Sequence, residues 1–228
     1  MTAWSYSSIT LFEQCPKKYY HLRVAKDIKE PESEAMNYGK DLHLAAEEYI
    51  RDGKPLPEKY IYIKELLDKL NLIKGEKLCE NKLAVKIVDG GKLAPCDFFD
   101  KNVWYRGIAD LIILDRENQE ARIIDYKTGK SAKYADTKQL KLLAACVFTH
   151  YPEIAIIKAG LLFVVSKEFI KEEYSTHHRL AYFEQFKPLV NQLDSCLETG
   201  VWNPKKNFTC KGWCPVVDCH HWEEKRKR

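Results

Sequence analysis

The 228-residue sequence predicts an α/β protein, with a mixed sheet flanked by helices. Apolar residues at helical spacing dominate the first third of the chain, and short apolar runs typical of strands follow. Helical and strand-like segments then alternate towards the carboxyl end. The length suits one hydrophobic core with a small appendage, and 45% hydrophobic and 31% charged residues are ordinary for a globular protein.

The predicted helices have recognisable ends. Ser7 or Ser8 can cap a first short helix, which Pro16 ends or kinks. Gly53 ends the next helix, because glycine readily takes the left-handed conformation found there. This helix covers 35–52, and further helices are predicted at 58–73, 134–149 and 177–199.

Four apolar runs predict strands, and turn residues separate the first three of them. These runs cover 77–88, 103–114, 121–127 and 158–165. The second run carries Asp110 and the third carries Asp125. If these two runs form a hairpin, the two carboxylates come close together at one edge of the sheet.

Asp110, Asp125 and Lys127 together suit phosphodiester hydrolysis. Strand side chains alternate between faces, so Asp125 and Lys127 point the same way. Carboxylates provide the hard oxygen ligands that Mg²⁺ or Mn²⁺ prefers, and a nearby ammonium group can orient water or stabilise the transition state. The alternative is structural, with Asp110 ending a strand and Asp125 and Lys127 forming a salt bridge.

Charge and cysteine content narrow the class of protein. The net charge of +4 does not by itself indicate nucleic-acid binding, although a local basic groove would be compatible with it. Without a secretory signal or an apolar run of ~18 residues, a cytoplasmic, reducing compartment is expected. Disulfides are rare there, so the eight cysteines raise the question of metal ligation.

Further motifs accompany the carboxylates in a fixed order. They are Ser7-Ser8, Phe12, Cys15-Pro16 and Tyr19-Tyr20, then Gly39, His43 and Glu47, then Gly107 to Asp110, Asp125 to Gly129, and Gln139-Leu140. Over residues 5–219, this ordered set resembles the RecB-type branch of the PD-(D/E)XK nuclease superfamily. The resemblance implies a restriction-endonuclease-like sheet in a single nuclease domain, 1–228. Its core would be 36–199, and its terminal parts, 1–35 and 200–228, would be joined at a metal cluster.

The resemblance also implies roles for individual residues. The catalytic residues would be Asp110, Asp125, Lys127 and Gln139. The ligands of Mg²⁺ or Mn²⁺ would be His43, Asp110, Asp125 and the backbone carbonyl of Tyr126. Two positions depart from the family pattern: Ala109 replaces a proline, and Leu143 replaces a tyrosine whose contact therefore cannot be assigned.

The spacing around His43 agrees with a role at the metal. Gly39, His43 and Glu47 repeat every four residues and so share one helix face. The alternative is that His43 and Glu47 only form hydrogen bonds on the helix surface. Glu80, inside an otherwise apolar strand, is another candidate to lie near the metal.

Cys210, Cys214 and Cys219 lie within ten residues and need a fourth ligand to complete a metal site. The resemblance implies that Cys15 is this ligand and that the cofactor is a [4Fe–4S] cluster. The spacing here is C-x3-C-x4-C, where the family usually has C-x2-C-x5-C. Two alternatives stay open: Zn²⁺, with His220 or His221 as a ligand, and three reduced structural cysteines.

Basic and aromatic residues suggest two regions of contact with DNA. Lys17, Lys18 and Tyr20 combine charge with an aromatic ring, which suits a single strand, although a solvated helix face would look the same. Lys130 and Lys138 flank the catalytic segment and can follow a phosphate backbone.

The function implied by the resemblance is a Mg²⁺- or Mn²⁺-dependent deoxyribonuclease, acting as an exonuclease on single-stranded ends. It would serve recombination, repair or phage DNA processing in a bacterial, archaeal or phage-infected cell, with a helicase or recombination protein as a candidate partner. One alternative is a catalytically silent DNA-binding subunit with a structural iron–sulfur or zinc site. Another is an iron–sulfur or zinc protein unrelated to DNA.

Overall fold

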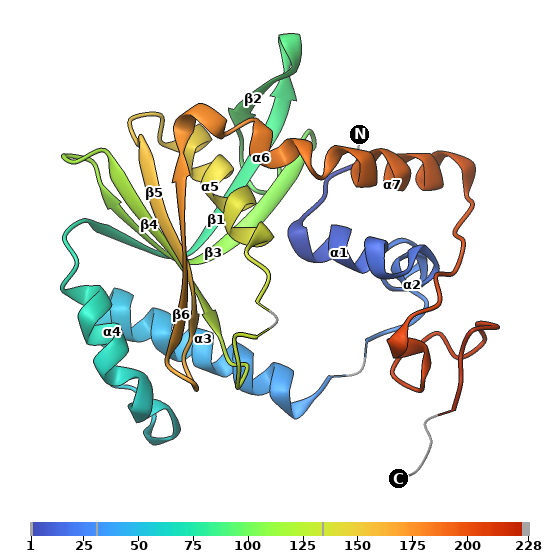
Figure 1. The fold of residues 1–228 in the computed structure, drawn as a ribbon, viewed down its shortest axis with the longest axis horizontal. Helices are drawn as coiled ribbons and strands as arrows, with labels where there is room; N and C mark the ends of the chain where they lie inside the picture. Colours follow the sequence, from blue (N-terminus) through green and yellow to red (C-terminus); the bar gives the residue numbers. More distant parts are fainter. Residues whose placement is uncertain (1, 31, 134, 225–228) are drawn as a thin grey trace. The chain divides into compact units, whose positions relative to one another are not determined.

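The structure is a computed structural model that describes residues 2–30, 32–133 and 135–224 (Figure 1). Two compact units make up the chain: residues 34–184 form one, and residues 1–33 with 185–228 form the other. We call them the sheet unit and the terminal unit. Tyr134, predicted to begin a helix, lies outside the described residues.

In the described part of the sheet unit, six strands form one sheet in the order β2-β1-β3-β4-β5-β6. Only β4 and β5 run parallel; every other neighbouring pair is antiparallel. The strands are β1 (Glu76–Val88), β2 (Lys92–Pro95), β3 (Tyr105–Asp115), β4 (Glu120–Lys127), β5 (Ile156–Phe163) and β6 (Glu168–Ser175). The predicted mixed sheet flanked by helices is therefore confirmed.

Helices cover the two faces of this sheet (Figure 1). They are α3 (Glu34–Asp52), α4 (Lys64–Asn71), α5 (Lys138–His150) and the short α6 (Ala181–Glu184). Leu42 of α3 and Leu67 of α4 pack in one core cluster with Leu111, Ile124 and Tyr126 of the sheet. α5 is buried along most of its length and packs on the opposite face. Within the described chain, no helix has the length and apolar character needed to span a membrane.

The pairing of β3 and β4 stops before the end of either strand. β3 pairs with β4 from Leu111 to Asp115, but with β1 it continues as far as Tyr105. β4 pairs with β5 from Glu120 to Lys127, so its last residues, from Asp125 to Lys127, pair with β5 alone. The two strands thus separate at Asp110 and Asp125, a point that we call the fork.

The structure corrects two of the predicted helices. The helix predicted at 177–199 is wrong: α6 and α7 (Lys187–Thr199) are separate, and Pro188 lies in the first turn of α7. Proline is tolerated there but would break a helix interior. The helix predicted at 58–73 begins instead as a 3₁₀ turn, Glu58–Ile63, and only α4 is α-helical.

Strands β2 and β6 were not predicted. Both are edge strands, and β6 has the charged sequence EFIKEEYS. One side of an edge strand faces solvent, so it needs no continuous apolar run.

The terminal unit is mainly helical. Its elements are α1 (Tyr6–Gln14), α2 (Pro16–Tyr19), a π-helical turn (Tyr20–Ala25), α7 and a 3₁₀ turn (Phe208–Cys210). The cap of α1 is Ser5 rather than Ser7 or Ser8, and the Ser8 side chain completes its capping box. Trp202 stacks on Tyr19 with ring centroids 6.0 Å apart, so the segment after α7 packs beside α2.

Candidate active site and cysteine pocket

The fork brings the predicted catalytic residues of β3 and β4 together. Oδ2 of Asp110 accepts a hydrogen bond of 2.7 Å from the backbone N–H of Tyr126, which ties the two strands at this point. Asp125 is almost fully buried, with 3% of its surface exposed. Nζ of Lys127 lies 2.5 Å from Oδ2 of Asp125, and the two groups form an ion pair.

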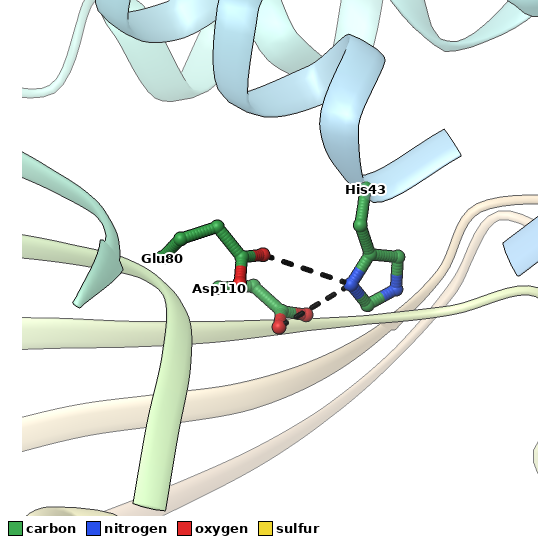
Figure 2. Close-up of side chains that lie close together, drawn as sticks. All are labelled: His43, Glu80 and Asp110. Carbon is green, nitrogen blue, oxygen red and sulfur yellow. Dashed lines mark ion pairs between the residues drawn. The ribbon is translucent and has the colours of Figure 1, made fainter. Parts of the chain in front are cut away.

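His43 reaches the fork from α3 (Figure 2). Its Nδ1 atom lies 3.4 Å from Oδ1 of Asp110 and 4.0 Å from Oε1 of Glu80. Its Nε2–H donates a hydrogen bond of 3.1 Å to the carbonyl oxygen of Tyr126. A backbone carbonyl commonly holds the outer nitrogen of a metal-binding histidine in this way. This contact leaves Nδ1 facing the two carboxylates.

Glu80 is the site residue that the sequence identified least clearly. It lies in the middle of β1, where its φ of 46° is unusual for a residue other than glycine. Cys79 and Asn81 pair with Leu111 and Ala109 of β3, so the position of Glu80 is opposite Asp110. One ligand atom each from His43, Glu80 and Asp110 lie within 4.8 Å of one another. The only sequence signal for this residue is its position as the one acid of the predicted strand 77–88.

The concentration of carboxylates changes the proton affinity of the site. Burial, reinforced by the negative charge of Asp110, raises the pKa of Asp125 to about 6, against the effect of Lys127. The same two causes raise the pKa of Glu80. Burial lowers the pKa of His43, but the hydrogen bond and charge of Asp110, with the charge of Glu80, outweigh burial and raise it. The site therefore has an excess of negative charge that a cation would neutralise.

A groove of about 690 Å³ runs along α3 to these side chains. Gly39, His43 and Glu47 of α3 line it together with Glu80 and Thr128. Glu47 forms an ion pair with Arg51, so this carboxylate is engaged on the helix. A Cβ atom on Gly39 would lie 3.6 Å from Oγ1 of Thr128, an ordinary contact distance. The residue that follows β4 therefore lies beside α3 at this glycine.

The other predicted residues of this region lie further along the chain. Gln139 is in the first turn of α5, and no hydrogen bond joins it to Asp125 or Lys127 among the described residues. Leu143, at the position where the family has tyrosine, is fully buried and lies against Gly107. Lys130 and Lys138 are both exposed, and Nζ of Lys138 lies 3.8 Å from a carboxylate oxygen of Asp136.

The terminal unit gathers four cysteines around one pocket. Cys15 follows α1, and Cys210, Cys214 and Cys219 come from the segment after α7; all four line this pocket and are free thiols. Within the described residues, no three of the four sulfur atoms lie within 4.8 Å of one another. The four cysteines thus line one pocket without forming the compact set of ligands that a single ion would need.

Donors and cations surround these sulfurs. Backbone N–H groups of Lys205 and Asn207 point at Sγ of Cys15 and Sγ of Cys210, at 3.4 and 3.5 Å. Lys18 lines the same pocket and lowers the pKa of Cys214, although burial of that thiol raises it more strongly. Such donors and positive charges stabilise thiolates.

The residues predicted to contact DNA near this pocket take two different positions. Lys18 is buried, with 8% of its surface exposed, and its Nζ lies 3.5 Å from Glu30. Lys17 is half-buried and also lines the pocket. Tyr20 packs its ring against Trp202, with centroids 5.4 Å apart. His221, considered as a zinc ligand, lies at the pocket as well.

Comparison with known proteins identifies the family. The model of the PD-(D/E)XK nuclease superfamily matches residues 3–219. Among solved structures, the chain resembles a candidate exonuclease from Eubacterium rectale at 10% sequence identity, over 98% of this chain and 89% of that one, with a TM-score of 0.50. It also resembles the protein SSO0001 at 14% identity, over 97% and 87% of the two chains, with a TM-score of 0.49.

At 10% identity the likeness to the Eubacterium rectale structure concerns the fold alone. No curated protein matches this sequence. The family match covers almost the whole chain, including the fork and the four cysteines of the pocket. The chain belongs to the PD-(D/E)XK nuclease superfamily.

Proposed function

We propose that this protein is a Mg²⁺- or Mn²⁺-dependent exonuclease of the RecB-type branch that degrades single-stranded DNA from its ends. The observation that carries this proposal is the convergence of His43, Glu80 and Asp110 beside the buried Asp125 and its partner Lys127. If Asp125 and Lys127 formed only a structural salt bridge, there would be no reason for His43, Glu80 and Asp110 to lie beside them.

The donor set fits a hard divalent cation. Carboxylate oxygens of Glu80 and Asp110 and Nδ1 of His43 would hold the ion, with Asp125 as a further oxygen ligand at the fork. When bound, the metal polarises the phosphate and neutralises charge that develops during hydrolysis. Tyr126, predicted as a carbonyl ligand, keeps His43 oriented, and a second lone pair of its carbonyl is still available.

Lys127 would act directly on the reacting groups. Its side chain is about one-third exposed, while its partner Asp125 is buried, so the ammonium group lies at the boundary between the fork and solvent. From there it can orient the attacking water and donate to a phosphate oxygen that gains charge in the transition state. Asp125 positions this ammonium group through their ion pair.

We further propose that Cys15, Cys210, Cys214 and Cys219 hold a [4Fe–4S] cluster. Four free thiols on one pocket, with N–H donors and lysines around them, support this assignment. Sulfurs around a single zinc ion lie about 3.8 Å apart, because each zinc–sulfur bond is about 2.3 Å in a tetrahedron. In a [4Fe–4S] cluster each thiolate would bind a different iron, so its four sulfurs would be spaced more widely than the ligands of one zinc ion.

The mode of cleavage can be tested with substrates that differ only in having ends. Anaerobically purified protein with Mn²⁺ is expected to degrade linear single-stranded DNA and to leave the same sequence intact as a closed circle. Addition of a chelator should stop the reaction. Rapid cutting of the circle would contradict an exonuclease and indicate an endonuclease. Metal-independent cleavage, or none, would contradict the proposed function itself.

The cellular role is proposed from the family resemblance alone. Recombination, repair or phage DNA processing in the cytoplasm would each supply single-stranded ends, and a helicase is the partner that generates them. A catalytically silent DNA-binding subunit is the outcome to conclude if intact protein binds DNA but cleaves no substrate.

A further inference from the structure

A second group of side chains lies on the sheet unit near the fork, outside the site described above. Phe98 and Phe99 follow β2, and their ring centroids are 5.3 Å apart. Nζ of Lys82 lies 5.9 and 5.7 Å from the two centroids, and the guanidinium carbon of Arg106 lies 5.6 Å from that of Phe98. We call Lys82, Phe98, Phe99 and Arg106 the cation–aromatic patch.

The sheet connects this patch to the fork. Lys82 follows Glu80 by two residues on β1, so their Cα atoms are about 7 Å apart along the strand. Lys82 pairs with Ile108 on β3, and Ile108 precedes Asp110 by two residues. A single strand of DNA that runs from the carboxylates along β1 and β3 would therefore reach the cation–aromatic patch next.

The patch is open to solvent, which argues against a role in the core. Phe99 has 74% of its surface exposed, an unusual position for a phenylalanine. Lys82 and Ile108 are exposed beside it, and Arg106 is half-buried.

The two cations have no acidic partner. Among the described residues, no carboxylate lies within ion-pair distance of Lys82 or Arg106, whereas Lys59, Lys74 and Lys86 of the same unit are paired with acids. The nearby acids are engaged elsewhere: Asp97 accepts from the backbone N–H of Phe99, and Asp100 pairs with Lys86. The positive charge of the patch is therefore available to an anion.

We propose that the cation–aromatic patch binds the single-stranded DNA that enters the fork, an inference that rests on the proposed function. A base stacks on the exposed ring of Phe99, and adjacent phosphates contact Lys82 and Arg106. Exposed rings beside unpaired cations suit this ligand, because a single strand offers both an open base face and a phosphate. A duplex hides its base faces and would use only the cations.

Two substitutions separate stacking from charge. Binding of the full-length, anaerobically purified protein to a fluorescent single-stranded oligonucleotide is followed by anisotropy at several salt concentrations, with EDTA present to prevent cleavage. Phe99→Leu should raise the Kd about tenfold without changing its salt dependence, whereas Phe99→Tyr should restore the affinity to within about twofold. Lys82→Gln should lower the slope of log Kd against log salt by about 0.7.

Matched controls test whether the effect belongs to this place. Lys171 lies over the Phe169 ring on β6, at 5.6 Å, so Lys171→Gln removes a similar cation away from the proposed path and should bind as wild type does. Phe99→Leu should change binding to blunt duplex DNA less than twofold. Thermal melting of each variant checks that the fold is retained.

Two results would contradict different parts of the account. If wild type binds and cleaves single-stranded DNA but folded Phe99→Leu and Lys82→Gln bind it as tightly and with the same salt slope, the patch is not part of the DNA path. If wild type neither binds nor cleaves single-stranded DNA, the proposed function is wrong, and the inference falls with it.

Discussion

Lys127→Ala is expected to lower the single-turnover rate of DNA cleavage by about 10²- to 10³-fold, the usual effect of removing one preorganised donor to a developing charge. The substitution leaves His43, Glu80 and Asp110 in place, so Mn²⁺ affinity, measured by calorimetry, should stay within about threefold of wild type. Cleavage at the wild-type rate would show that Lys127 has no role in the chemistry.

Two further variants show whether the effect of Lys127→Ala on cleavage arises from the reacting groups or from metal binding. Glu80→Gln removes a proposed ligand and should weaken Mn²⁺ binding more than Lys127→Ala does, with activity partly restored at high Mn²⁺. Lys171→Ala removes a lysine from β6, outside the proposed site, and should leave both quantities unchanged. If Lys127→Ala instead behaves as Glu80→Gln does, Lys127 acts through the metal site rather than on the reacting groups.

Cys15→Ser is expected to abolish the brown colour that the proposed [4Fe–4S] cluster would give the protein, and to lower its Tm by on the order of 10 °C. The physical reason is that Cys15 and Cys210 are far apart in sequence, and a link between them restricts a very long loop in the unfolded chain. A loss of about 3 kcal/mol corresponds to such a shift for a protein of this size. Differential scanning calorimetry and visible absorbance provide the two measurements.

Cys196→Ser is the matched control for that variant. Cys196 belongs to α7 in the same unit but does not line the pocket, so colour and Tm should be nearly unchanged. Wild type should contain about four iron atoms and no zinc by elemental analysis. One zinc per chain without iron, or a fully coloured Cys15→Ser variant, would contradict the cluster assignment.

The sequence was sufficient to predict the helices and strands that have a regular apolar spacing and a clear turn or end residue. α3 ends at Asp52, directly before Gly53, whose φ of 67° takes the left-handed conformation that a helix end requires. The apolar runs of β3 and β4 form the expected hairpin, and this pairing brings Asp110 beside the backbone of Tyr126. The periodicity of single segments was thus enough to predict most strands of the sheet.

Other features depend on contacts between segments and had no local signal. β6 is a charged edge strand, and its pairing is decided by β5 rather than by its own composition. Glu80 joins the site because of its unusual φ and its place opposite Asp110, neither of which a sequence pattern shows. Lys18 looked like a DNA contact, but its side chain is buried at the cysteine pocket.

The most direct test of the account compares wild type with Asp125→Asn on end-labelled linear single-stranded DNA with Mn²⁺. Asparagine has nearly the shape of aspartate, and burial already raises the pKa of Asp125 to about 6, so the neutral side chain should not weaken the fold. Wild type is expected to shorten the DNA, and Asp125→Asn to do so at least about 10²-fold more slowly, with its colour and Tm retained. Equal cleavage by both proteins, or none by wild type with its cluster intact, would contradict a nuclease site at the fork.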